Sequence, residues 1–104
     1  MNRDWRSFGL EDQIAIVTGA SQGIGRTLAI ALAQAGEDVA LVSRTRSDLE
    51  TVAKEIEAAG RQALVIPTDI QDVSQIRKMV DAVHTTFGKI DILINNAAWT
   101  ATVA

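Results

Sequence analysis

Glycine recurs in this sequence at a spacing that suits phosphate binding. Gly19, Gly23 and Gly25 lie between a short apolar run and a segment whose apolar residues recur at helical spacing. An anion is bound at such a junction by unpaired backbone N–H groups at the start of a helix, provided that no side chain blocks its approach. Gly19 allows a sharp exit from the strand, Gly23 a close approach of a pyrophosphate, and Gly25 close packing of the helix. The candidate loop residues are Gly19, Ser21, Gln22, Gly23, Ile24 and Gly25. The alternative is an ordinary tight turn, but a strand before the loop and a helix after it favour nucleotide binding.

The elements that must position this loop alternate along the chain. Short runs rich in β-branched apolar residues alternate with longer segments of helical spacing, which is typical of βαβ units and a parallel sheet. The predicted strands are 14–18, 38–43, 63–66 and 90–95, and the predicted helices are about 23–35, about 48–59 and a third that ends at Phe87. The strands are apolar almost throughout, as expected where helices cover both faces of the sheet. The sequence therefore predicts an α/β fold with a doubly wound parallel sheet.

The ends of the predicted helices carry their own signals. Each helix is followed by a glycine, the residue that adopts the left-handed C-terminal conformation at least cost. These glycines are Gly36, Gly60 and Gly88. Ser47 and Glu50 predict a capping box at the second helix, and Asp72, with Gln75 three places on, predicts the N-cap of the third. Pro67 is expected just past the third strand, where its missing N–H breaks no ladder bond.

Apolar spacing also predicts which face of each helix packs on the sheet. For the first helix these residues are Ile24, Leu28, Leu32 and Ala35. For the second they are Leu49, Val52, Ala53 and Ile56, and for the third they are Ile76, Met79, Val80, Val83 and Phe87.

Two motifs together resemble the short-chain dehydrogenase/reductase family. The first is the T-G-x-x-x-G-x-G spacing that begins at Thr18, and the second is Asn95-Asn96-Ala97 after the fourth strand. The family has N-N-A-G at the second motif, so Ala98 adds a methyl group near the position where the family holds its cofactor. The resemblance spans about residues 8–98 and implies a Rossmann-like sheet with strand order 3-2-1-4. It also implies hydride transfer between a nicotinamide and a carbonyl or alcohol, as in ketoacyl or sugar reductases.

The end of the second strand bears on which nicotinamide cofactor is bound. In dinucleotide folds an acidic residue there accepts from the ribose 2′-OH, whereas an arginine meets a 2′-phosphate. Here the segment is Ser43-Arg44-Thr45, without a carboxylate and with a guanidinium that can offer several donors to a phosphate. The sequence therefore favours NADP(H) over NAD(H). The alternative is that Arg44 and Arg46 are solvated charges at the start of a helix, and Gln22 stands where many NADP-preferring relatives carry a basic residue.

The resemblance implies further contacts with the cofactor. Asp69 and Ile70 match the pair that holds the adenine, although an aspartate after a proline is more often a turn or a cap. The segment Asn96, Ala97 and Ala98 matches the part of the family motif that contacts a cofactor ribose, and the asparagines could equally satisfy backbone groups at the strand end.

The residues that would do the chemistry are not assigned in this chain. Carbonyl reduction needs a proton donor for the developing alkoxide and a hydrogen bond to the carbonyl oxygen. In the family these come from a serine and a Tyr-x-x-x-Lys pair beyond the fourth strand, and this sequence of 104 residues has no tyrosine. We therefore expect no catalytic residue and no activity from the chain alone. Three interpretations stay open: part of an NADP(H)-dependent alcohol dehydrogenase or ketone reductase, a non-catalytic NADP(H)-binding module, or a structural remnant.

A truncated sheet of this order would leave the fourth strand as an edge with free N–H and C=O groups. We therefore expect a fragment, a truncated product, or a chain that self-associates or pairs through the edge at 92–94. His84 is expected on the surface. Trp5 is expected to pack in the N-terminal arm. Trp99 follows the motif at which relatives often shape the substrate entrance, so a substrate or interface contact and a role without such a contact both stay open.

Composition limits the remaining classes of function. An apolar content of 47% over this length fits one domain, with an arm at 1–12 and an incomplete dinucleotide-binding domain at 13–104. The formal net charge of −3 gives no broad attraction to nucleic acid or an anionic membrane. The absence of cysteine excludes a disulfide framework and a thiolate zinc site, no metal site is expected, and a reducing, cytoplasmic location is favoured. The sequence shows neither a signal peptide nor an apolar run that spans a membrane.

Overall fold

The computed structural model describes residues 12–96, which form a parallel sheet with helices on both faces. The elements are β1 (Ile14–Thr18), α1 (Gly23–Gln34), β2 (Asp38–Ser43), α2 (Arg46–Ala58), β3 (Ala63–Pro67), α3 (Val73–Phe87) and β4 (Ile92–Asn95). The strand order is β3-β2-β1-β4 and every pair is parallel. The predicted α/β class, the strand order and the helices between the strands are confirmed. No helix within 12–96 is both long and apolar enough to cross a bilayer.

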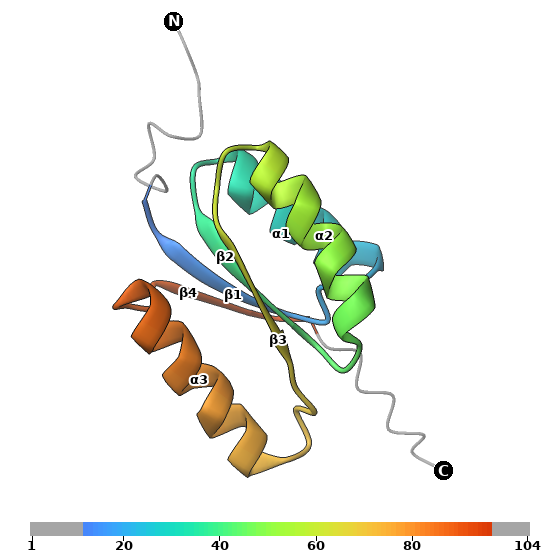
Figure 1. Cartoon of the computed structure of the whole chain (residues 1–104), viewed down its shortest axis with the longest axis vertical. Helices are drawn as coiled ribbons and strands as arrows, with labels where there is room; N and C mark the ends of the chain where they lie inside the picture. Colours follow the sequence, from blue (N-terminus) through green and yellow to red (C-terminus); the bar gives the residue numbers. More distant parts are fainter. Residues whose placement is uncertain (1–11, 97–104) are drawn as a thin grey trace, which may run out of the picture.

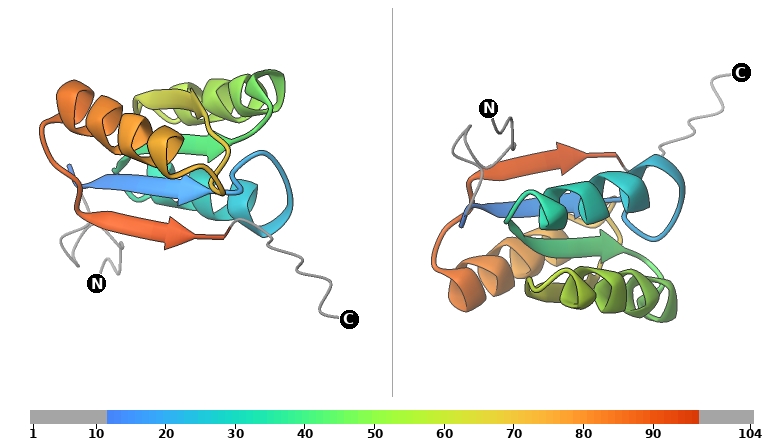
Figure 2. Two further views of the ribbon diagram at one scale, coloured as in Figure 1. Left: turned by 90° about the horizontal axis from the view of Figure 1, so that it is seen from below. Right: turned by 90° about the horizontal axis from the view of Figure 1, so that it is seen from above.

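The sheet separates two apolar clusters. Helices α1 and α2 lie on one face and α3 lies on the other, as the two views at right angles to Figure 1 make plain (Figures 1 and 2). Alternate residues of β1 and β2 supply the two clusters, so Val17 and Leu41 face α1 and α2, while Ile16 and Val42 belong to the α3 side. The central strands are therefore buried on both sides, which explains their continuous apolar sequence.

Helix α1 buries its small residues most completely, while of the predicted face Ala35 is buried and Leu32 packs, partly buried, against the same cluster. Gly25, Ala29 and Ala33 are its buried residues, whereas Ile24 is 70% exposed. Small side chains let the helix axis approach the sheet closely, and this contact turns Ile24 outward. The predicted face is therefore wrong at Ile24. Apolar spacing gives more weight to large side chains than to glycine and alanine, so it does not indicate where a helix lies close to the sheet.

The predicted faces of the other two helices are largely confirmed. All four residues named for α2 are buried, and Met79 and Val83 are buried beneath α3. Ile76 and Phe87 are partly buried against the same cluster, while Val80 is 38% exposed at its margin.

Several boundaries differ from the prediction. Helix α2 begins at Arg46 with Thr45 as its N-cap residue, so the capping box predicted at Ser47 is wrong. Strand β3 includes Pro67, which pairs with Ser43, and a proline is tolerated there because β3 is an edge strand of the described sheet. Strand β4 begins at Ile92 and not at residue 90.

Other predicted boundaries are confirmed: the end of α1, the start of α3 and the glycine after each helix. Asp72 caps α3 by accepting from the backbone N–H groups of Ser74 (2.9 Å) and Gln75 (3.4 Å). The Gln75 side chain donates back to the other carboxylate oxygen at 3.3 Å. All three glycines that follow the helices have positive φ, as a left-handed C-terminal residue requires.

The amino ends of the strands gather charged side chains. Asp91 accepts from the backbone N–H of Ile14 at 2.8 Å and pairs with Lys89 at 3.2 Å. The hydrogen bond from Ile14, more than the charge of Lys89, lowers the pKa of Asp91. Glu37, between α1 and β2, is fully buried, and neither of its carboxylate oxygens has a hydrogen-bond partner among the described residues. Burial first, and then the negative charge of Asp91, raise the pKa of Glu37.

Candidate functional site

The sheet order places the candidate site at the carboxyl ends of β1 and β4. The chain leaves β1 toward β2 on one side, whereas it reaches β4, on the other side of β1, only after α3. Crevices form where neighbouring strands of an α/β sheet are connected in opposite directions, and ligands bind there. Thr18 and Asn95 are register partners at this point, so the glycine loop and the asparagine motif adjoin.

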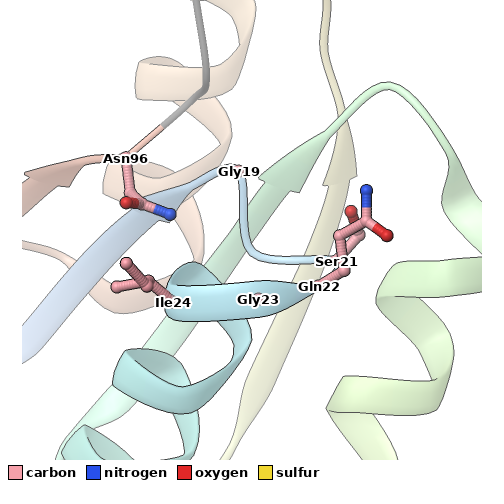
Figure 3. A pocket seen from close by; sticks show the side chains of 6 residues that line it. All are labelled: Gly19, Ser21, Gln22, Gly23, Ile24 and Asn96. Atoms are coloured by element: carbon pink, nitrogen blue, oxygen red, sulfur yellow. The ribbon is translucent and has the colours of Figure 1, made fainter.

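A cavity of about 340 Å³ lies at this point of the sheet. Its lining residues are Gly19, Ser21, Gln22, Gly23, Ile24 and Asn96, each of which the sequence singled out (Figure 3). In Figure 3 Ile24 and Asn96 stand on the same side of the loop, and Ser21 and Gln22 stand at its opposite end. The exposure of Ile24 thus has a positional explanation, since its side chain forms one wall of the cavity.

Gly23 leaves both the backbone and the space of the loop open. Its φ is +62°, which L side chains rarely adopt, and a Cβ atom built there would meet nothing within 4 Å. The space that a side chain would occupy is therefore free for a ligand that approaches the backbone.

Gly25 serves a different purpose. A Cβ atom at this position would lie 2.7 Å from Nδ2 of Asn96 and would collide with the carbonyl oxygen of Gly19. Only glycine lets the first turn of α1 pass this close to the ends of β1 and β4. The contact therefore fixes the distance between the helix start and the asparagine motif.

The start of α1 keeps its amide donors available. Its N-cap residue, Gln22, makes no side-chain cap hydrogen bond, and no acidic residue lies in the first turn. At α3, by contrast, Asp72 occupies the equivalent donors. Unpaired N–H groups and the positive end of the helix dipole together favour an anion beside the loop.

Thr18 connects the two motifs through its hydroxyl group. The oxygen accepts from the backbone N–H of Asn96 at 2.9 Å and lies 3.0 Å from Oδ1 of Asn95, to which it can donate. Thr18 is 4% exposed. In the sequence Thr18 is only the first residue of the glycine motif, and the signal for this further role was a hydroxyl at the end of an apolar strand.

A second group of predicted residues meets at the ends of β2 and β3. The backbone of Thr68 donates to the carbonyl of Ser43 at 2.7 Å, and the backbone of Thr45 donates to the Ser43 hydroxyl at 3.4 Å. Nη2 of Arg44 lies 3.6 Å from Oδ1 of Asp69. The sequence did not predict that these two charged residues pair, because no local pattern indicates that the two strand ends adjoin.

The remaining predicted residues divide between the core, the surface and the undescribed part of the chain. Ile70 packs against the α3-side cluster, so its side chain faces the core. His84 is exposed, as expected. Ala97, Ala98, Trp5 and Trp99 lie outside the described residues. Within 12–96, no three His, Asp or Glu residues are grouped in a way that could hold a metal ion.

Comparisons with known proteins identify the family of the chain. The sequence model of the family described as short chain dehydrogenase matches residues 13–104. An uncharacterized oxidoreductase of Mycobacterium tuberculosis is 41% identical over 93 residues, which cover 89% of this chain and 35% of that protein. The chain thus spans about a third of the length of the curated relatives it matches.

Solved structures show the same similarity. A hydroxysteroid dehydrogenase from Escherichia coli superposes with a TM-score of 0.85 at 35% identity, covering 93% of this chain and 40% of that one. A xylitol dehydrogenase with bound NAD⁺ has a TM-score of 0.84 at 33% identity, with 86% of this chain and 35% of that one covered.

Proposed function

The chain belongs to the short-chain dehydrogenase family of oxidoreductases, and from this premise we propose that it binds NADP(H). The pyrophosphate would lie over Gly23, against the amide groups at the start of α1. The observation that carries the proposal is the cavity between the glycine loop and Asn96, where Gly23 leaves open space. Residues 13–104 would form the dinucleotide-binding domain.

The choice of NADP(H) over NAD(H) depends on Arg44. Its guanidinium is 67% exposed at the end of β2, next to the position where dinucleotide folds hold the adenosine ribose. Segment 43–45 contributes no carboxylate for the ribose 2′-OH. The xylitol dehydrogenase with bound NAD⁺ shows that a similar fold accepts the other cofactor. Asp69 and the Asn96 segment would contact the adenine and a ribose respectively.

Hydride transfer between the nicotinamide and a carbonyl or alcohol substrate is proposed for a longer protein that contains this chain. The sequence has no tyrosine to serve as the proton donor of the family. The 104 residues alone would therefore hold the cofactor without turning it over, as a binding module does. A cytoplasmic location stays a prediction from the sequence.

Titration of the chain with NADPH and with NADH, followed by nucleotide fluorescence or calorimetry, tests the proposal. We expect both to bind, NADPH more tightly, and no oxidation of NADPH in the presence of simple ketones. Replacing Arg44 by glutamine should weaken NADPH binding about ten-fold, because a charge-assisted hydrogen bond to the phosphate is lost. NADH binding should stay nearly unchanged. Tighter binding of NADH than of NADPH would contradict the choice of cofactor.

Strand β4 provides a proposed surface for association. Within the described residues it pairs only with β1, and Leu93 is 63% exposed on the face toward α3. In the 104-residue chain we propose that this edge pairs with a second copy. Sedimentation should then show a dimer that Leu93→Lys disrupts, whereas a monomer at all concentrations would count against the pairing.

A further inference from the structure

The carboxylate of Asp69 is held in place by its neighbours. Its Oδ1 accepts from the backbone N–H of Gln71 at 2.9 Å, and its own backbone N–H donates to the Gln75 side chain at 2.8 Å. Gln75 is in turn bonded to the cap residue Asp72. The negative charge at the end of β3 is therefore fixed in position.

The guanidinium of Arg44 is attracted to this carboxylate but is not bonded to it. A separation of 3.6 Å is within ion-pair distance and beyond hydrogen-bond distance. The Arg44 guanidinium donates no hydrogen bond within residues 12–96. The other nearby arginine, Arg46, pairs with Glu50 on its own helix. Both pairs are longer than a hydrogen bond, so both arginines retain donors, and Arg44 is the one that lies beside Asp69 at the ends of β2 and β3.

A phosphate group at the adenosine 2′ position would compete with Asp69 for this cation. A phosphate monoester carries about −1.5 to −2 charges at neutral pH, so it attracts Arg44 more strongly than a carboxylate does. To reach Arg44 it must also approach Asp69, which carries charge of the same sign. A ribose with a free 2′-OH meets neither effect.

We propose that Asp69 is a specificity-determining residue, which reduces the preference for a 2′-phosphate by pairing with Arg44. The inference rests on the proposed function, since it places the adenosine at the ends of β2 and β3. Arg44 supplies the preference for NADP(H), and Asp69 limits it. The pair is solvent-exposed, at 67% for Arg44 and 38% for Asp69, so the limit is modest.

The quantity that tests this is the ratio of the dissociation constants for NADH and NADPH, measured by calorimetry on the full chain. The two probes differ only by the 2′-phosphate, so any contact of Asp69 with the adenine cancels in the ratio. Asp69→Asn is suitable because its amide oxygen can still accept from the Gln71 N–H. We expect the ratio to rise about three-fold, which is typical of an exposed ion pair.

A matched control and a double variant isolate the pairing. Asp81→Asn removes one negative charge from the exposed side of α3 and should leave the ratio unchanged. In an Arg44→Gln background, Asp69→Asn should raise the ratio by less than in the wild type, because only the direct repulsion between Asp69 and the phosphate is then removed.

The outcomes separate the inference from the function on which it rests. If both dinucleotides bind and Asp69→Asn leaves the ratio unchanged, the inference is overturned and the proposed function stands. A rise of the same size in the Arg44→Gln background would overturn the role of the pairing. Failure of the wild-type chain to bind either dinucleotide would overturn the proposed function and the inference together.

Discussion

The two ends of the parallel sheet use polar groups in opposite ways. At the amino ends, carboxylates are matched by groups of the protein itself: Asp91 by the Ile14 N–H and Lys89, and Asp38 by Arg61 at 3.1 Å. At the carboxyl ends of β1 and β4, the loop leaves amide donors and a cavity open. An end whose polar groups are satisfied internally stabilises the fold, whereas an end that leaves donors unpaired can receive a ligand.

Glu37 is the exception to this contrast. It is fully buried at the amino end, yet its carboxylate has no hydrogen-bond partner among residues 12–96. An ionised carboxylate without partners is costly to bury, which is why the pKa of Glu37 is raised.

The largest effect is expected at the carboxyl end, from Gly25→Ala. The new methyl would collide with the Gly19 carbonyl and approach the Asn96 amide, so the start of α1 must move away from the strands. We expect a loss of about 3 kcal/mol in the free energy of unfolding and no detectable NADPH binding. Chemical denaturation and a fluorescence titration would measure both.

Gly23→Ala is the matched control for this change. Its methyl meets no atom within 4 Å, so only the positive φ opposes it, at about 1 kcal/mol. This variant should stay folded and bind NADPH more weakly, since the methyl enters the space above the loop. Equal destabilisation by both variants would contradict the separate purposes of the two glycines.

A smaller effect, of opposite sign, is expected at the amino end from Glu37→Gln. The folded-state pKa of Glu37 lies above its ordinary value of 4.5. The contribution of Glu37 to the free energy of unfolding is therefore fully present below pH 4.5 and is lost as pH rises through the raised pKa. Glutamine cannot ionise, so it should be more stable than wild type at neutral pH by about 1 kcal/mol.

The pH dependence distinguishes this effect from packing. The advantage of Glu37→Gln should disappear in acid, where glutamate is protonated in both states. Denaturation curves from acidic to neutral pH would show the two stabilities converge below 4.5. Glu57→Gln, on the exposed side of α2, should show no such divergence. A constant difference at all pH values would rule out ionisation as the cause.

The smallest effect is expected at the start of α3, where the Asp72 side chain caps the helix. Hydrogen bonds from the Ser74 side chain, and next from the Gln75 N–H, lower the pKa of Asp72. The stability that Asp72 contributes is therefore present above its ordinary value of 3.8 and is lost as pH falls through the lowered pKa.

Asp72→Ala should lower the melting temperature by a few degrees at neutral pH, and Asp72→Asn should retain most of the cap. Melting curves at neutral and strongly acidic pH would measure this, with the wild type and the alanine variant converging in acid. A melting temperature unchanged by Asp72→Ala would show that the start of α3 does not need this side chain.

Local and periodic signals in the sequence predict much of the molecule. The strands, the buried face of α2, the Asp72 cap and the glycine loop each depend on residues a few positions apart. The predicted face of α1 fails at Ile24 because Gly25, Ala29 and Ala33 carry the contact, and small residues give a weak periodic signal. The predicted start of α2 fails because Ser47 and Glu50 match the capping-box pattern, whereas the helix begins at Arg46 with Thr45 as its N-cap residue and no side-chain cap hydrogen bond.

The features that the sequence could not predict depend on distant contacts. The raised pKa of Glu37 depends on its burial and on the charge of Asp91, the pair of Arg44 and Asp69 joins two strand ends, and the Thr18 hydroxyl reaches β4. Each requires the strand register, which no local pattern encodes. The candidate site was therefore predictable residue by residue at its loop, whereas the interactions that tune it were not.

The pairing of β1 with β4 also determines how late the site is completed. The bond between Ile14 and Asp91 closes a separation of 77 residues, whereas β2 follows β1 after a single helix. Contacts of such high sequence separation cost the most chain entropy and form slowly. During synthesis one edge of β1 stays unpaired until β4 has been made. Asn96, which lines the cavity, takes its place only when β4 pairs. A nucleotide that bridges Gly19 and Asn96 would therefore hold together the first and last strands of the described fold.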